Sequence, residues 1–160
     1  GAQYWTSAMG TNAALAAILG ALFWFGGWKI VALVVLPTVI VAASAGVWLF
    51  FVQHQFEETH WDSAEDWQMH DAALNGSSNY VLPPVLRWFS GNIGIHHVHH
   101  LYSRIPFYRL PEVLRDHAAL ANAQRLTFLE SFACARLHLW DEANRKLLSF
   151  AEARRLPAAV

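Results

Sequence analysis

The chain has 160 residues, of which 55% are hydrophobic and only 14% are charged, against about 25% charged in ordinary soluble domains. Its formal net charge of −1 gives no electrostatic basis for binding nucleic acid. The single cysteine, Cys134, excludes an intramolecular disulfide and a cysteine-based metal cluster within this chain.

Two apolar runs in the first third predict membrane-spanning helices. Ile30–Val52 contains 23 residues without a charge, and about 20 such residues suffice to cross a bilayer. Ala8–Phe25 is a marginal span, because its 18 residues reach only about 27 Å. The glycines of Gly26-Gly27, flanked by aromatic residues and Lys29, predict an interfacial turn and therefore an antiparallel helical hairpin. A buried helix of a soluble core is the weaker alternative.

Charge is concentrated in the rest of the chain. All twelve acidic residues and ten of the eleven Lys and Arg residues follow Gln53. We therefore expect both chain ends on the cytoplasmic side of the membrane and the tip of the hairpin on the other side.

Short helices are expected in the middle of the chain. Ser63–Asp66 resembles a capping box and predicts a helix over Ala64–Leu74. Pro83-Pro84 starts another helix, which is too short to span a membrane. Asn92 is expected to cap a histidine-rich helix, which must end before Pro106.

The C-terminal residues 111–160 are expected to form a cytosolic cap. A helical pattern begins at Pro111, and the capping box Thr127–Glu130 predicts a helix that continues to about Leu139. Lys146–Phe150 is expected to be a short strand. The predicted fold is an all-α membrane protein, with a transmembrane hairpin over residues 8–52, an interfacial metal-site region over 53–110 and this tail.

The segment from Gly94 to Leu101 places four histidines within five positions. If it is helical, His96, His99 and His100 share one face, whereas His97 lies about 100° away. Three neutral imidazoles on one face favour a metal site. The alternative is a polar helix face, or histidines satisfied by carboxylates in a core, which would crowd donors together for little gain.

His54 is the second candidate ligand, at the point where the second apolar run leaves the membrane. Glu57 and Glu58 follow it by three and four residues and, with Asp62, are candidates to orient an imidazole for a metal. An ordinary interfacial histidine is the alternative. His60 is a less favoured ligand, and the remaining histidines are expected at the surface: His70, His117 and His138.

Two of these motifs resemble one known family. His96-x-x-His99-His100, followed by Leu101-Tyr102-Ser103-Arg104-Ile105-Pro106-x-Tyr108, resembles the third histidine box of membrane fatty acid desaturases. Gly46–Glu57 is similar to the omega-6 (delta-12) acyl-lipid branch of that family. The resemblance covers roughly Thr11–Arg155. The histidine box, the Ile105-Pro106-x-Tyr108 segment that follows it and the Gln53-His54 stretch are together strongly specific for this family.

The resemblance implies a function and a set of ligands. His96, His99 and His100 would bind iron, with His54 as an additional ligand, in a di-iron centre completed by histidines that precede Gly1 in the family. The chain would then be the C-terminal half of an enzyme that uses O2 to introduce a cis double bond into an acyl lipid or carrier-bound acyl chain. Ferredoxin or a cytochrome b5-like protein would supply electrons. The expected location is the bacterial inner membrane, with the metal site on the cytoplasmic side.

Three other readings stay open. A histidine-box hydroxylase or ketolase of alkanes, sterols or carotenoids would use the same metals, although the segment Tyr102–Tyr108 favours a desaturase. A non-catalytic membrane protein that binds metal or haem is the second, but haem would need histidines inside facing spans, and both predicted spans contain none. The third is a membrane hairpin with a tail that binds nothing.

Overall fold

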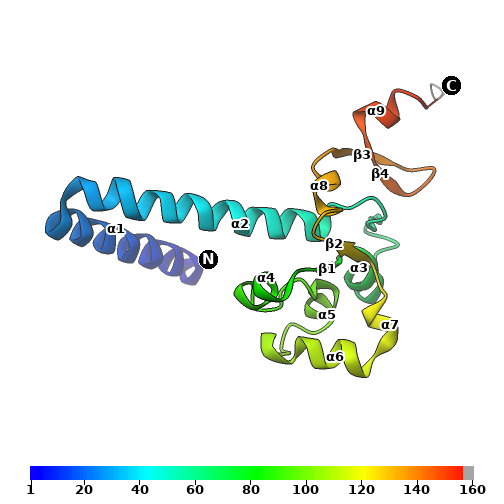
Figure 1. The fold of residues 1–160 in the computed structure, drawn as a ribbon, viewed down its shortest axis with the longest axis horizontal. Coiled ribbons are helices and arrows are strands. Elements are labelled where there is room, and N and C mark those ends of the chain that lie inside the picture. The colour runs from blue at the N-terminus through cyan, green and yellow to red at the C-terminus, as the bar shows by residue number, and fades with distance from the viewer. Residues whose placement is uncertain (157–160) are drawn as a thin grey trace. The chain divides into compact units, whose positions relative to one another are not determined.

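The computed structural model describes residues 1–156 and is drawn in Figure 1. Contacts divide the chain into two compact units, which are Gly1–Val47 and the residues from Trp48 onward. The chain is mostly helical, as expected.

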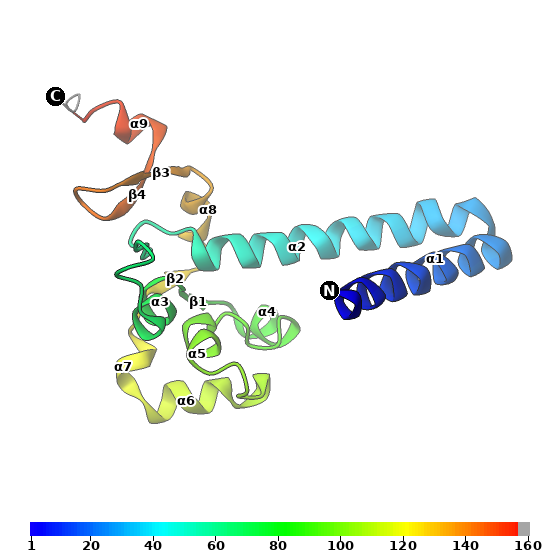
Figure 2. The same cartoon turned by 180° about the vertical axis from the view of Figure 1, so that it is seen from behind.

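The first unit is helical throughout. Helix α1 (Ala2–Ile30) passes through a π-helical stretch, η1 (Val31–Val35), into helix α2 (Leu36–His54). Gly27 is the one residue of α1 with a non-helical backbone, at φ 68° and ψ 178°, a conformation that glycine adopts without steric cost. The segments on either side of it lie side by side and run in opposite directions in both views (Figures 1 and 2).

The helices of the first unit expose apolar side chains along their length. Ala2–His54 is long and apolar enough to cross a membrane by length and composition, with a mean hydropathy of 2.5 and no part of its most apolar window buried. Exposed apolar surface costs about 25 cal/mol per Å² in water, so this composition suits lipid better than water. A single helical stretch of this kind near the N-terminus is weak support for a membrane location.

The second unit contains short helices joined by turns. The helices are α3 (Met69–Asn75), α4 (Pro84–Phe89), α5 (His96–Leu101), the 3₁₀ helix η2 (Phe107–Arg109), α6 (Leu110–Asp116), α7 (Ala118–Ala121), α8 (Ser131–Cys134) and α9 (Phe150–Ala153). Pro84 lies in the first turn of α4, as predicted, because a missing N–H costs nothing there.

Four short strands show that the expectation of an all-α fold is wrong. Strand β1 (Asn79–Val81) pairs in parallel with β2 (Arg125–Thr127), and β3 (Leu137–Asp141) forms an antiparallel hairpin with β4 (Lys146–Ser149). Strand β4 lies where a strand was predicted.

Two predicted helices are shorter than expected because their capping contacts close only local turns. The Ser63 hydroxyl donates to Asp66 at 2.9 Å, yet α3 begins only at Met69. The Thr127 backbone N–H donates to Glu130 at 2.8 Å, yet α8 ends at Cys134. A capping box satisfies the first N–H groups, but it does not supply an apolar face that prolongs the helix.

Two apolar clusters hold the second unit together. Val52, Phe56, Tyr80, Leu82 and Cys134 form the first cluster, so Cys134 is a packing residue, as expected. The second consists of Ile95, Val98 and Leu110. It fixes one face of α5 against α6 and thereby leaves another face of α5 for the histidines.

Candidate metal centre

Three imidazole nitrogens converge in the second unit. His54 is the last residue of α2, and His96 and His100 lie one turn apart on α5. The Nε2 atom of His100 lies 3.1 Å from Nε2 of His54 and 3.0 Å from Nε2 of His96. Nitrogens bound at about 2.1 Å to one metal lie about 3.0–3.4 Å apart at angles of 90–109°. Both distances to His100 are therefore those of two ligands on one metal ion, and the donor atoms of all three residues lie within 4.8 Å of one another.

The tautomer of His54 follows from its second nitrogen. Nδ1 lies 2.8 Å from the backbone carbonyl oxygen of Phe50, which can only accept a hydrogen bond. Nδ1 therefore carries the proton and donates, and Nε2 keeps a lone pair directed at the other two imidazoles. A carbonyl acceptor on the far nitrogen is a common way to orient a metal-binding histidine.

Burial keeps two imidazoles of the cluster, those of His96 and His100, neutral. The pKa of His96 is lowered to about 3, mainly by burial and additionally by the neighbouring imidazoles of His100, His54 and His99. The pKa of His100 is lowered for the same reasons, with burial the largest. Imidazole binds a metal only in its neutral form, so both side chains are ready to bind near neutral pH.

Gln53 connects the two elements that carry the donors. Its side chain is 1% exposed, and Nε2 donates to the carbonyl oxygen of Ile93 at 3.2 Å. The backbone carbonyl of Gln53 accepts from the backbone N–H of Ser78 at 2.9 Å. The end of α2 is thereby tied to the segment before α5. Sequence reasoning missed this role, although a glutamine beside His54 at the end of an apolar run was a usable signal.

The backbone before α5 is closely packed against β1. The N–H of Tyr80 donates to the carbonyl of Gly94 at 2.7 Å, and a Cβ atom at Gly94 would collide with the carbonyl oxygen of Tyr80. The start of α5 is therefore fixed by the main chain. Asn92 does not cap this helix as predicted: the N-cap residue is Ile95, and the Asn92 amide donates instead to the carbonyl of Phe107 at 3.1 Å.

His99 lies beside the cluster but outside its converging group of donor atoms. Its ring stacks on that of His96, with centroids 5.7 Å apart and an interplanar angle of 22°. The helical phase brings His99 to the side of α5 that carries His96 and His100. Its role as a ligand stays a prediction from the resemblance.

His97 points away from the cluster, as the helical phase predicts. It is fully buried, and its Nε2 donates to the carbonyl of Leu120 at 2.9 Å. Burial lowers the pKa of His97, which keeps it neutral. The side chain thus anchors α5 to the end of α7.

We expect His97→Ala to destabilise the fold rather than remove a donor. The change leaves a cavity and removes the hydrogen bond from the imidazole to the Leu120 carbonyl, which together cost about 2–4 kcal/mol. Thermal unfolding of the detergent-purified protein should show a clearly lower melting temperature, and the folded fraction should still bind metal. A melting temperature equal to that of the wild type would contradict this assignment.

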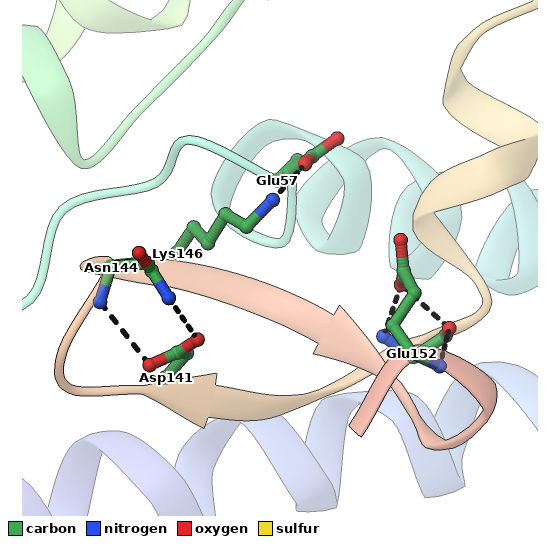
Figure 3. A network of polar contacts seen from close by, with 6 residues as sticks. Glu57, Asp141, Asn144, Lys146 and Glu152 are labelled. Atoms are coloured by element: carbon green, nitrogen blue, oxygen red, sulfur yellow. Dashed lines mark hydrogen bonds and ion pairs between the residues drawn. The ribbon is translucent and has the colours of Figure 1, made fainter. Parts of the chain in front are cut away.

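Two of the three predicted orienting carboxylates have other contacts. Glu57 forms an ion pair with Lys146 at 2.9 Å (Figure 3). Asp62 binds Arg145 and His60, and Glu58 is exposed. Among the described residues no hydrogen bond joins any of the three to the histidine cluster. The remaining histidines, expected at the surface, are exposed: His70, His117 and His138.

Comparison with known proteins gives two matches. The sequence model of the fatty acid desaturase family matches residues 1–132. A protein of Bacillus subtilis (strain 168) named "Fatty acid desaturase" is 39% identical over 150 residues, which cover 94% of this chain and 43% of that protein. The chain therefore spans less than half of the length of this relative. No solved structure matches the chain significantly.

Proposed function

The chain belongs to the fatty acid desaturase family, and we propose that it supplies part of a histidine-ligated iron centre that introduces a cis double bond into a fatty acyl chain. The observation that carries the proposal is the convergence of three Nε2 atoms, from His54, His96 and His100. Family membership indicates which reaction the converging side chains would serve.

Each of these side chains would have a defined task. His54, His96 and His100 would hold a metal through Nε2, and the Phe50 carbonyl would keep the imidazole of His54 in the required tautomer. Bound iron would supply, together with O2, the oxidising power needed to remove hydrogens from an unactivated CH2–CH2 unit. The burial of His96 would exclude water from one side of the site.

The finer features of the reaction are part of the same proposal. The overall change would join two hydrogens from the acyl chain, two external electrons and two protons with O2 to give two waters. The resemblance of Gly46–Glu57 to the omega-6 branch supports a delta-12 position for the double bond. The substrate would be an acyl lipid or a carrier-bound acyl chain. The donor would be ferredoxin or a cytochrome b5-like protein, and a second iron would bind histidines outside this chain.

The proposed location is supported by the first unit. The exposed apolar helices α1 and α2, with the change of direction at Gly27, support a transmembrane hairpin in the bacterial inner membrane. The charged residues after Gln53 support a cytoplasmic position for the histidines. The acyl chain would then reach the metals from the apolar side.

Expression of the whole protein that contains this chain tests the proposed reaction. In a bacterial host whose membranes lack delta-12 double bonds, we expect new fatty acids with a cis double bond at that position. Gas chromatography and mass spectrometry of derivatised methyl esters locate the bond, and cells with the empty vector are the control. Hydroxylated acyl chains without new double bonds would overturn the proposal in favour of a hydroxylase.

A further inference from the structure

We propose that the β3–β4 hairpin positions the loop that follows His54, with Arg145 and Lys146 as positioning residues for the metal centre. The inference rests on the proposed metal centre. It adds a part of the chain that the match to the family's sequence model does not cover, because the matched residues are 1–132 and β3 begins at Leu137.

The loop over residues 55–62 begins directly at the candidate ligand. The Thr59 hydroxyl donates to the carbonyl of His54 at 3.0 Å, so the loop folds back onto the end of α2. The loop contains no helix or strand. Its position, and through it the last turn of α2, must therefore be fixed by contacts from elsewhere.

Strand β4 makes the first of these contacts. The backbone N–H of Leu147 donates to the carbonyl of Glu57 at 2.9 Å. The ammonium group of Lys146 donates to the carboxylate of the same residue at 2.9 Å, as Figure 3 shows. Glu57 is three residues from His54, so this pair holds the part of the loop next to the ligand.

The turn of the hairpin makes the second contact, at the far end of the loop. Arg145 Nη2 donates to the carbonyl of Trp61 at 3.0 Å and to the carboxylate of Asp62. The side chain of Asp62 is only 13% exposed, and a hydrogen bond to a charged group shielded from water is stronger than one at an open surface. The loop is therefore held near both of its ends.

A pocket of about 510 Å³ is lined by parts of the loop and of the hairpin. Its walls are formed by the end of α2, the loop and the hairpin: His54, Gln55, Thr59, His60, Trp61, Gly76, Trp140, Glu142 and Leu147. The rings of Trp61 and Trp140 form an aromatic contact between loop and hairpin, with centroids 6.3 Å apart. The hydrogen bonds and ion pairs of Arg145 and Lys146 add the directional contacts that fix the position of the loop. A shift of the loop would reach the His54 ring, which lines the same pocket.

The test uses three double variants of the whole protein that contains this chain. Arg145→Met with Lys146→Met removes both cationic contacts but keeps the apolar stems of the side chains. Arg145→Lys with Lys146→Arg restores the charges. Arg154→Met with Arg155→Met is the matched control, because it removes two positive charges from exposed positions of the same C-terminal region.

Two readouts separate positioning from mere stability: the dissociation constant for Co²⁺ and the absorption spectrum of the bound Co²⁺, which reports its ligand geometry. We expect the first variant to bind Co²⁺ about tenfold more weakly, as the loss of groups that orient a ligand typically causes, with an altered spectrum. The restored variant should approach the wild type, and the control should equal it in both readouts.

The outcomes distinguish the inference from the metal centre itself. If the wild type binds no more Co²⁺ than His96→Ala, the proposed centre is wrong. If the wild type binds Co²⁺ and Arg145→Met with Lys146→Met binds it equally tightly with an unchanged spectrum, the centre stands and the role of the hairpin is overturned. Equal weakening in the matched control would also overturn it, because the effect would then follow charge alone.

Discussion

Replacing His54, His96 or His100 by alanine in the whole protein is expected to abolish the formation of double bonds. Each change removes one of the three converging Nε2 atoms, and no other described donor atom belongs to that group. Loss of groups that merely orient a ligand costs 10–100-fold in activity, so loss of a ligand should cost more than about 100-fold. From the resemblance we expect the same of His99→Ala.

Fatty-acid profiles of cells that express each variant at equal protein levels measure this effect. His70→Ala is the control, because His70 is exposed and should leave the profile unchanged. His97→Ala should reduce the product only as far as it reduces the amount of folded protein. A variant of His100 that retained wild-type levels of product would show that the cluster is not the reaction centre.

Residues 1–160 alone are expected to bind at most one weakly held metal and to have no desaturase activity. Two irons with four to six donors each need about eight to twelve donor atoms, whereas the chain offers three converging nitrogens and His99 beside them. Two of the three candidate carboxylates, Glu57 and Asp62, do not fill the gap, because they are engaged by Lys146 and Arg145.

Metal analysis of the purified chain measures the stoichiometry directly. Co-expression with the part of a full-length relative that this chain does not cover should raise the metal content to two per complex and restore product. Two tightly bound irons in the isolated chain would show that the count of ligands is wrong.

The histidine helix could be predicted because its information is local. A spacing of i, i+3 and i+4 fixes one face of a helix whatever surrounds it, so the common side of His96, His99 and His100 and the different direction of His97 follow from the sequence. The approach of His54 to His100 could not be derived from spacing. The family resemblance predicted a shared centre, and a contact across 46 residues confirms only that the rings are close.

Other features depended on tertiary contacts. Beside His54 the sequence offers two carboxylates, Glu57 and Glu58, as orienting groups, but the ring donates to the main-chain carbonyl of Phe50. Because every residue has a main-chain carbonyl, the sequence gives no sign of which one is used. The strands β1 and β2 have only three residues each, too few for alternation to indicate a strand. Their pairing depends on a partner far along the chain rather than on propensity.

The parallel pairing of β1 with β2 affects the order in which the protein can assemble. Arg125 is paired with Asn79, 46 residues earlier, and every histidine of α5 lies between them. At a synthesis rate of about 5–20 residues per second, the second strand leaves the ribosome about 2–9 s after the first. During that interval the imidazoles of α5 have been made, but β1, which pairs with Ile95 directly before α5, has no partner strand, so the surroundings of α5 can be completed only after β2 has emerged.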